Sequence, residues 1–403
     1  MTAMVVIGAG QAGASLAARL RALGHDGPLT LIGDEPAPPY QRPPLSKAYL
    51  LGQLARDRLF LRPEGFYAEQ GIALRTGVTV TAIDRAARQV HLSDGTVLAY
   101  DMLALTTGGT PRRLPPAAGG DLAGVHVLRG ISDADMLGPA LRPGARMAVI
   151  GGGYIGLEVA AVAAGRGLDV TLIEAAPRIL QRVAAPETSD FFRALHMDHG
   201  VRVIEGAGSA RLVGNGRVQA AELADGTRIP TDVAVVGIGI APADGLAQAA
   251  GLALDNGIAV DAQGRSSDPH VWAAGDCASF PVPGGRLRLE SVPNAIDMAE
   301  AVAANMLGAG KPYVPQPWFW SDQYDVKLQI AGLAGGQDRV VVRADPGGPR
   351  SHWYFTGDRL LAVDAMNDAR AFMLAKRLLA EGRSPDPVRI ADPATDLRTL
   401  LRA

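Results

Sequence analysis

Two stretches of this 403-residue chain repeat one pattern and decide its fold: AMVVIGAGQAGASLAARLRALG (residues 3–24) and RMAVIGGGYIGLEVAAVAAGRG (residues 146–167). Each begins with a short apolar strand, passes through a G-x-G-x-x-G turn and continues as an alanine-rich helix that ends near a glycine. Such a turn alone is weak evidence, but its place between a strand and a helix is the context of a dinucleotide-binding fingerprint. The chain therefore predicts two dinucleotide-binding units.

The second half of each unit matches as well. VHLSDGTVLAYDMLALTTGG (90–109) and AAELADGTRIPTDVAVVGIG (220–239) both place two apolar strands around an Asp-Gly-Thr turn, which is a strong hairpin signal. Each then closes with an apolar strand that ends in glycine. The repeat therefore covers a complete α/β architecture.

The glycines of the two turns have three physical roles: a tight turn, a close approach of the backbone to a pyrophosphate, and close packing of the helix. The diphosphate would bind the N–H groups at the positive end of each helix. In this order of roles, the glycines are Gly8, Gly10 and Gly13 in the first turn and Gly151, Gly153 and Gly156 in the second.

An acidic residue follows the second strand of each unit, as the fingerprint requires. It is Asp34 or Glu35 in the first unit and Glu174 in the second. A carboxylate there accepts hydrogen bonds from ribose hydroxyls and repels a 2′-phosphate, so Glu174 favours NADH over NADPH. Arg178 weakens this prediction slightly, because an arginine nearby can bind a phosphate.

Composition and charge narrow the class of protein. With 48% apolar and 20% charged residues the chain is globular, and its length suggests two or three domains. The net charge of −2 does not indicate nucleic acid or an acidic membrane surface. No apolar run reaches transmembrane length, and the first strand begins too early for a leader. One cysteine, Cys277, cannot form an intrachain disulfide, so a cytoplasmic location is expected.

The pattern changes after residue 316. KLQIAGLA (327–334), RVVVRA (339–344) and HWYFTGDRLLAVDAMN (352–367) are typical of antiparallel strands, with a turn at Gly357-Asp358. Residues 368–382 then predict a helix with Asn367 or Asp368 as its cap and Gly382 at its end. The predicted domains are 1–112 with 240–315, 113–239, and an α+β interface domain over 316–403.

Two dinucleotide sites in one chain are understandable when one cofactor reduces the other. On these grounds the sequence resembles the glutathione-reductase-like flavoproteins, and closely the NADH-dependent ferredoxin reductases of bacterial cytochrome monooxygenases and aromatic-ring dioxygenases. The resemblance covers nearly the whole chain. It is carried by GAGQAG (8–13), PPYQRPPLSKAYL (38–50), GGGYIGLE (151–158), GDCA (275–278), ESVPNA (290–295) and PWFWSDQYD (317–325).

The resemblance implies two Rossmann-like domains, with FAD on 1–112 and 240–315 and NAD on 113–239. Asp276 would accept a hydrogen bond from a ribityl hydroxyl, although it also suits a helix N-cap. Arg129 would neutralise pyrophosphate charge. Besides the glycines of the first turn, the implied FAD contacts are Ala12, Asp34, Lys47, Val80, Arg129, Asp276 and Val292. The NAD contacts are Gly151, Gly153, Ile155, Gly156, Glu174 and Gly239.

Three further residues are implied at the reacting end of the flavin. The family places the positions of Lys47 and Glu158 together as an ion pair beside the isoalloxazine. A solvated loop lysine is the alternative for Lys47, and Glu158, expected in the first turn of its helix, would suit the helix dipole there in any case. Trp320 shares one face of an extended segment with Trp318, and the resemblance implies that it lies beside the flavin.

The same residues argue against rival chemistries. Dithiol oxidoreductases need a C-x4-C pair beside the flavin and NADH oxidases or peroxidases need one cysteine, but RPPLSKAYL (42–50) has none. Cys277 is therefore interpreted as a small buried filler. His196 and His199 have the spacing of metal ligands, but no third ligand stands nearby, and His199-Gly200 is typical of a helix end. No metal is predicted.

The resulting hypothesis is an FAD enzyme that takes hydride from NADH at flavin N5 and passes single electrons to a two-iron two-sulfur ferredoxin. That ferredoxin would feed a monooxygenase or a ring-hydroxylating dioxygenase. Rubredoxin reductases, the apoptosis-inducing-factor type and a redox-responsive flavin-binding protein remain alternatives. The expected molecule is a monomer or weak homodimer without nucleic-acid or membrane partners. Candidate docking residues for an acidic ferredoxin are Arg370, Lys376 and Arg377.

Overall fold

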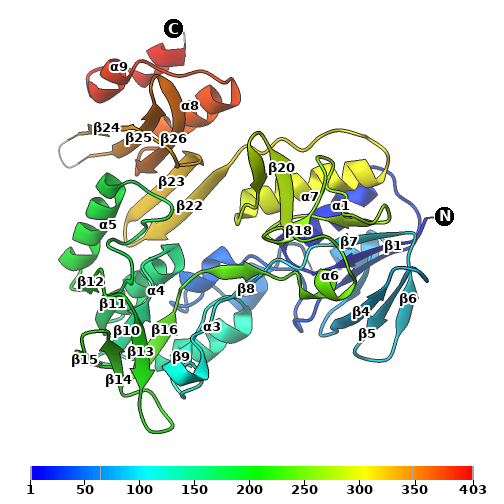
Figure 1. The fold of residues 1–403 in the computed structure, drawn as a ribbon, viewed down its shortest axis with the longest axis horizontal. Helices are drawn as coiled ribbons and strands as arrows, with labels where there is room; N and C mark the ends of the chain where they lie inside the picture. Colours follow the sequence, from blue (N-terminus) through cyan, green and yellow to red (C-terminus); the bar gives the residue numbers. More distant parts are fainter. Residues whose placement is uncertain (1, 64, 346–347, 402–403) are drawn as a thin grey trace. The chain divides into compact units, whose positions relative to one another are not determined.

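The computed structural model describes residues 2–63, 65–345 and 348–401 (Figure 1). The chain forms two compact units. Unit 1 comprises Met1–Gln41, Arg56–Thr110 and Ile240–Gln316, and unit 2 comprises Arg42–Ala55, Pro111–Gly239 and Pro317–Ala403. Among the described residues, no helix combines the length and the apolar character needed to cross a membrane.

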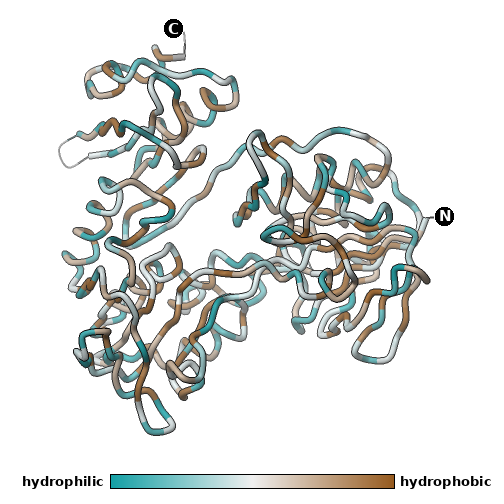
Figure 2. Tube along the Cα trace, in the orientation of Figure 1, coloured by the Kyte–Doolittle hydropathy of each residue, from teal (hydrophilic) through white to brown (hydrophobic). Residues whose placement is uncertain are grey.

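Unit 1 is built around a five-stranded parallel sheet in the order β19-β7-β1-β2-β3. The strands are β1 (Met4–Ile7), β2 (Leu29–Ile32), β3 (Ala73–Arg75), β7 (Met102–Leu105) and β19 (Val271–Ala273). Helices α1 (Gln11–Ala22) and α7 (Val292–Met306) pack against each other. Because the central strands are buried on both faces, their sequences are continuously apolar (Figure 2).

Smaller elements complete unit 1. An antiparallel sheet consists of β4 (Val80–Asp84), β5 (Gln89–Leu92) and β6 (Val97–Ala99), which confirms the hairpin predicted there. The other elements are α2 (Phe66–Glu69), α6 (Gly245–Ala249), η2 (Arg56–Leu59), β17 (Ile240–Pro242), β18 (Ile258–Ala259), β20 (Ala278–Val282) and β21 (Gly285–Leu287); β8 (Gly109–Pro111) lies at the boundary with unit 2.

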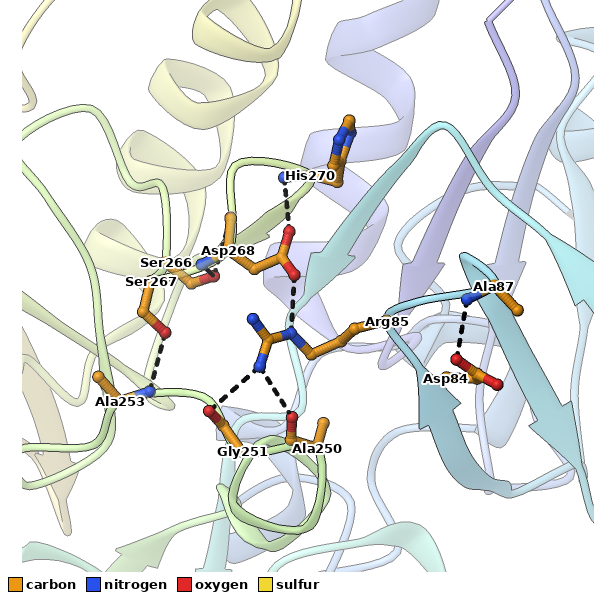
Figure 3. A network of polar contacts seen from close by, with 10 residues as sticks. All are labelled: Asp84, Arg85, Ala87, Ala250, Gly251, Ala253, Ser266, Ser267, Asp268 and His270. Carbon is orange, nitrogen blue, oxygen red and sulfur yellow. Dashed lines mark hydrogen bonds and ion pairs between the residues drawn. The ribbon is translucent and has the colours of Figure 1, made fainter.

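A polar network joins distant segments of unit 1 (Figure 3). Arg85, which follows β4, donates from Nε to Asp268 Oδ2 at 2.7 Å and from Nη1 to the carbonyl oxygens of Ala250 and Gly251 at 3.2 Å. The other Asp268 oxygen accepts the backbone N–H of His270 at 2.9 Å. One arginine thus ties the small antiparallel sheet to residues more than 160 positions later in the chain.

Unit 2 contains a second parallel sheet in the order β12-β11-β10-β16-β9. Its strands are β9 (Val125–His126), β10 (Arg146–Ile150), β11 (Asp169–Ile173), β12 (Arg202–Ile204) and β16 (Val233–Val236). The antiparallel strands β13 (Ala210–Val213), β14 (Ala220–Leu223) and β15 (Arg228–Pro230) correspond to β4, β5 and β6 of unit 1. The predicted repeat therefore extends to strand order, because β10, β11 and β16 pair as β1, β2 and β7 do.

The helices of this part of unit 2 are α3 (Ile131–Leu137), α4 (Tyr154–Gly165) and α5 (Pro186–Asp198), with 3-10 helices η1 (Pro43–Ser46), η3 (Pro116–Ala118) and η4 (Gly138–Ala140). Helix α5 ends with His199 as its C-cap and Gly200 at φ +81°, the helix end that the sequence predicts. Segment Arg42–Ala55 packs in unit 2, although the residues on both sides of it belong to unit 1.

The last part of unit 2 is an antiparallel sheet in the order β22-β23-β26-β25-β24, with α8 packed on β23 and β26 (Figure 1). Asp368 caps α8 by accepting the Ala371 N–H, so the predicted helix and its cap are confirmed. The elements are β22 (Trp318–Gln323), β23 (Val326–Gly332), β24 (Arg339–Ala344), β25 (Arg350–Thr356), β26 (Arg359–Met366), α8 (Ala369–Ala380), α9 (Pro387–Ala391) and η5 (Leu397–Leu401).

The expectation that Asp276 could cap a helix is wrong. Asp276 lies in a turn between β19 and β20, and no helix starts there. The residues after it pair with β18 as a strand, which leaves them unavailable for a helix. The next helix, α7, begins at Val292, and its cap is Ser291, whose Oγ accepts the Asn294 N–H at 3.2 Å.

Candidate active site

The two glycine-rich turns have the same backbone geometry. Gly8 and Gly151 both have φ of +108°, a value that L side chains rarely adopt. A Cβ on Gly8 would lie 2.2 Å from the Thr106 carbonyl oxygen, and one on Gly151 would lie 2.5 Å from that of Gly237. Both positions therefore require glycine for the backbone to approach the neighbouring strand.

The other glycines fit the roles predicted for them. A Cβ on Gly13 or Gly156 would lie 2.0 Å from the carbonyl oxygen of Gly8 or Gly151, so the helix packs directly on its own turn. Around the Cβ positions of Gly10 and Gly153 there is no atom within 4 Å. Neither α1 nor α4 has a side-chain cap or an acidic residue in its first turn. Both turns therefore fit a diphosphate on their first-turn amides.

The turns differ at one pair of positions. In unit 1 the middle residue of the turn is Ala9, and the residue after β2 is Gly33, where a Cβ would lie 2.6 Å from the Ala9 methyl. In unit 2 the equivalent residues are Gly152 and Glu174, and Glu174 Oε2 accepts the Gly152 N–H at 2.6 Å. A carboxylate can therefore follow the strand directly only in unit 2.

The acidic residue of unit 1 accordingly comes later. Asp34 lies one residue beyond Gly33 and is exposed, with its side chain available to a ligand. Glu35, the alternative from sequence, accepts a hydrogen bond from the Tyr40 hydroxyl at 2.5 Å. This difference supports Asp34 as the ribose acceptor.

Several residues expected at FAD gather at the first turn. A Cβ on Gly275 would lie 2.9 Å from Ala12 Cβ, so the turn that carries Asp276 packs against the start of α1. The same position lies 3.9 Å from Ala295 in the first turn of α7, the helix that begins at Val292. Val80 is buried at the start of β4. The residues of the expected FAD set that lie in unit 2 are Lys47 and Arg129.

Lys47 and Glu158 form an ion pair in unit 2. Lys47 Nζ lies 2.7 Å from Glu158 Oε2, with the lysine side chain 18% and the glutamate 2% exposed. Lys47 Nζ also donates to the Pro43 carbonyl oxygen at 3.3 Å, within the Arg-Pro-Pro segment. The pairing expected from the resemblance is present. The first-turn position expected for Glu158 is wrong, because α4 begins at Tyr154 and has no acidic residue in its first turn.

The tryptophan segment forms β22 and alternates as predicted. Trp318 and Trp320 stack at 5.6 Å on one face, and Lys376 of α8 lies 4.5 Å from the Trp318 ring. On the other face, the Phe319 ring packs 4.7 Å from that of Tyr154, the first residue of α4. The strand therefore separates α8 from the start of the second nucleotide-binding helix.

Beside the second glycine-rich turn, both carboxylate oxygens of Glu174 accept backbone N–H groups, since Oε2 accepts that of Gly152 and Oε1 accepts that of Ala176 at 2.7 Å. Arg178 donates to Ser189 Oγ at 2.5 Å, so the protein itself holds this arginine. Ile155, the second residue of α4, is 43% exposed. Gly239 has φ of +97° at the end of the segment that follows β16. This arrangement agrees with the predicted preference for NADH.

Cys277 is fully buried in unit 1. Its Sγ lies 3.5 Å from the carbonyl oxygens of Leu105 and Ala274, and burial raises the pKa of the thiol. A protonated, inaccessible thiol is a poor nucleophile. The structure therefore places the lone cysteine in the core, as interpreted from the sequence.

Sequence reasoning missed the side chains around Glu158. Ser46 donates to Glu158 Oε2 at 2.5 Å, and Ser321 donates to Oε1 at 2.7 Å. His196, considered above as a metal ligand, instead has its Nε2 2.9 Å from Gln323 Oε1. Among the described residues no group of three or more side chains could hold a metal ion. The period-two alternation of β22 signalled the inward face of Ser321 and Gln323 but not what they contact.

Two matching glycine-rich turns, a buried ion pair and a buried cysteine fit an oxidoreductase that binds two dinucleotides. Comparison with known proteins specifies the family. Residues 2–299 match the pyridine nucleotide-disulphide oxidoreductase family, and residues 318–401 match the reductase C-terminal family. The chain belongs to the pyridine nucleotide-disulphide oxidoreductase family.

Named relatives refine this placement. The chain is 44% identical to rhodocoxin reductase of Rhodococcus erythropolis over 98% of this chain and 93% of that protein. It is 43% identical to the ferredoxin–NAD⁺ reductase component of the anthranilate 1,2-dioxygenase system of Burkholderia cepacia, covering 98% of each. The structure matches the reductase of a covalent putidaredoxin reductase–putidaredoxin complex with a TM-score of 0.94, at 41% identity over 100% of this chain and 98% of that one.

These findings confirm several predictions. The fold class, the resemblance to the ferredoxin reductases and the oxidoreductase activity are confirmed, and the family supports FAD and NADH as cofactors. Relatives named as ferredoxin reductases do not favour the rubredoxin or apoptosis-inducing-factor alternatives.

Proposed function

We propose that this chain is an FAD-dependent ferredoxin reductase that takes hydride from NADH and passes single electrons to a two-iron two-sulfur ferredoxin. The observation that carries the proposal is the pair of matching diphosphate turns in a chain whose only cysteine is buried. Two bound dinucleotides can exchange a hydride, and without a thiol relay the electrons leave for an external acceptor. The names of the relatives indicate a ferredoxin as that acceptor.

The first turn is proposed for FAD and the second for NADH. FAD supplies the chemistry that accepts two electrons as hydride and releases them singly. The proposed FAD residues are Gly8, Gly10, Ala12, Gly13, Asp34, Lys47, Val80, Arg129, Asp276 and Val292. The proposed NADH residues are Gly151, Gly153, Ile155, Gly156, Glu174 and Gly239. The proposed FAD-binding domain is 1–112 with 240–315, the NAD-binding domain is 113–239, and the C-terminal domain is 316–403.

The protein's own groups would orient and neutralise charge. The amides at the start of α1 and α4 bind the diphosphates, and Glu174 accepts hydrogen bonds from a ribose. The Lys47 ammonium, held by Glu158, would stabilise negative charge on a bound flavin. Trp320 supplies an aromatic face beside the flavin.

Partners and location follow from the same proposal. The ferredoxin feeds a monooxygenase or ring-hydroxylating dioxygenase, and the reductase acts in the cytoplasm as a monomer or weak homodimer. Of the candidate docking residues, Lys376 lies over the Trp318 ring and Arg377 pairs with Glu381 at 2.8 Å. Arg370 is exposed at the start of α8.

Purified protein tests the function directly. We expect a flavin absorbance spectrum and reduction of cytochrome c by NADH that depends on added putidaredoxin, used as the probe ferredoxin. NADPH should support a lower rate. A colourless protein, or equal rates with and without the ferredoxin, would contradict the proposal.

A further inference from the structure

A chain of buried polar side chains leads from Glu158 into the interior of unit 2. Ser321 donates to Glu158 Oε1 at 2.7 Å, and Gln323 Nε2 donates to Ser321 Oγ at 3.2 Å. His196 Nε2 lies 2.9 Å from Gln323 Oε1, and the Tyr324 hydroxyl lies 3.2 Å from His196 Nδ1. Ser321, Gln323 and His196 are each at most 1% exposed.

The hydrogen bonds of this chain run in one direction. Gln323 uses its amide N–H toward Ser321, so its carbonyl oxygen must accept from His196 Nε2–H. The other ring nitrogen of His196 then accepts from Tyr324. Burial lowers the pKa of His196 to about 4, which agrees with this neutral form. Every donor in the chain therefore points toward Glu158.

The far end of the chain is held by its own packing. Tyr324 has φ of +55°, a left-handed conformation that is unfavourable for a tyrosine. Its ring stacks on that of His199 at 3.7 Å. Tyr324 lies in the two-residue turn between β22 and β23, where a positive φ is common, and its ring contact with His199 accompanies the hydrogen bond to His196.

We propose that Ser321, Gln323 and His196 are positioning residues that orient the Glu158 carboxylate and, through it, the Lys47 ammonium. The inference rests on the proposed function, which places Lys47 and Glu158 at the flavin. A carboxylate buried to 2% exposure needs a donor on each oxygen. Lys47 and Ser46 donate to Oε2, and Ser321 donates to Oε1. The chain behind Ser321 fixes the direction of its hydroxyl.

The reactivity of lysines toward acetic anhydride can test this. The chain has four lysines, Lys47, Lys311, Lys327 and Lys376, so mass spectrometry can follow each one in the same flavin-loaded sample. Acetic anhydride reacts slowly with an amine that is held in an ion pair. Loosening the pair between Lys47 and Glu158 should therefore speed the acetylation of Lys47. Lys376 is an internal control, because it lies on Trp318 on the opposite face of β22 from Ser321 and reports any displacement of that strand.

We expect Ser321→Ala and His196→Leu to label Lys47 about threefold to tenfold faster, the change that corresponds to losing one ordinary intramolecular hydrogen bond. His196→Gln keeps an N–H donor and should restore the wild-type rate. Ser351→Ala is the matched control, since Ser351 is a fully buried serine of β25 that accepts from Trp353 and donates to Asp368. It should leave the labelling of Lys47 unchanged.

Two outcomes would overturn the inference: an unchanged Lys47 rate in folded Ser321→Ala, or a parallel rise at Lys376. If Ser321→Ala does not fold, Ser321→Cys is used in its place. The thiol is similar in size to the hydroxyl but is only a weak hydrogen-bond donor. Ferredoxin-dependent cytochrome c reduction by the wild type tests the proposed function separately. The labelling needs no ferredoxin, so the two failures are distinguishable.

Discussion

Cys277 shows how one side chain separates this protein from the thiol-dependent members of its family. The residue is fully buried beside β7 and has a raised thiol pKa, so neither access nor ionisation favours chemistry. Asp276, its neighbour in the same turn, lies against the start of α1. The functional residue of this turn is therefore proposed to be the aspartate.

We expect Cys277→Ser to retain activity and Asp276→Ala to lose FAD. Serine has nearly the same size, and the cost of burying its hydroxyl is about 1 to 3 kcal/mol unless it finds a partner. The measurements are the flavin content of each purified variant and its rate with NADH. Iodoacetamide should not label the folded wild type but should label it in urea. Rapid labelling in the folded state would contradict the buried position.

Glu174 is the residue proposed to select NADH over NADPH. Its carboxylate is fixed by two backbone N–H groups, while Arg178 is held by Ser189. We expect Glu174→Ala to raise kcat/KM for NADPH relative to NADH by about tenfold or more, because repulsion of the 2′-phosphate is removed. Arg178→Ala is the control and should change the ratio less. An unchanged ratio in Glu174→Ala would disprove the role.

At the scale of elements, a buried polar cluster joins α5 to β25 and β26. Thr188 donates to Asp364 Oδ2 at 2.7 Å, and Tyr354 donates to the same oxygen. Within the part of the chain that the structure describes, Asp364 Oδ1 has no partner. Burial raises the pKa of Asp364 from 3.8 to about 6, despite these two hydrogen bonds. The cluster therefore carries an incompletely compensated charge at neutral pH.

This raised pKa predicts the sign of a pH effect. The contribution of protonated Asp364 to the free energy of unfolding is fully present below the pKa of the unfolded state, near pH 4. It is lost as pH rises through the folded pKa of about 6. Asp364→Asn should therefore unfold with a free energy about 2 to 3 kcal/mol higher than the wild type at pH 8 and with a much smaller difference at pH 4. Urea titrations at both values measure it. A difference independent of pH would show that Asp364 does not titrate as expected.

Local patterns predicted most of these elements but few of the contacts between them. The apolar strands, the hairpin turns and the Asp368 cap are encoded within short windows, so the sequence was sufficient for them. The chain from Glu158 to His196 joins residues 127 to 163 positions apart, and no local period signals such contacts. The helix expected after Asp276 failed because pairing with β18 overrode a favourable cap. Lys47 was found through resemblance, since nothing local shows that residues 42–55 pack in unit 2.

At the scale of the whole molecule, unit 1 is assembled from three separate segments of the chain. The Arg85 network joins two of them, and it is only partly exposed, with 35% of the arginine and 11% of the Asp268 side chain accessible (Figure 3). Burial raises the pKa of Asp268, but the hydrogen bonds from Arg85 and the His270 N–H outweigh this, so the net pKa is lowered. The contribution of ionised Asp268 to the free energy of unfolding is present above the pKa of the unfolded state. It is lost as pH falls through the lower pKa of the folded state.

We expect Arg85→Leu to reduce the free energy of unfolding at pH 7 by about 1 to 3 kcal/mol, because a buried carboxylate and two carbonyl groups lose their donor. The loss should shrink as the pH falls through the lowered pKa of folded Asp268, where this carboxylate becomes protonated. Arg75→Leu is the control, since its pair with Asp94 is exposed to solvent and should contribute less to stability. Equal losses in both variants would show that Arg85 does not join the segments.

The paired difference between the two glycine-rich turns has an evolutionary consequence. The parallel sheets of the two units share one strand order, as duplication of a single ancestral unit would produce, and positions 9 and 33 differ from the equivalent positions 152 and 174. Any side chain at 33 would collide with the Ala9 methyl, and Glu174 sits where a methyl on Gly152 would approach its carboxylate to 3.1 Å. A methyl at the first position and a carboxylate at the second are therefore poorly compatible within one turn. Glycine at both positions would be compatible with either.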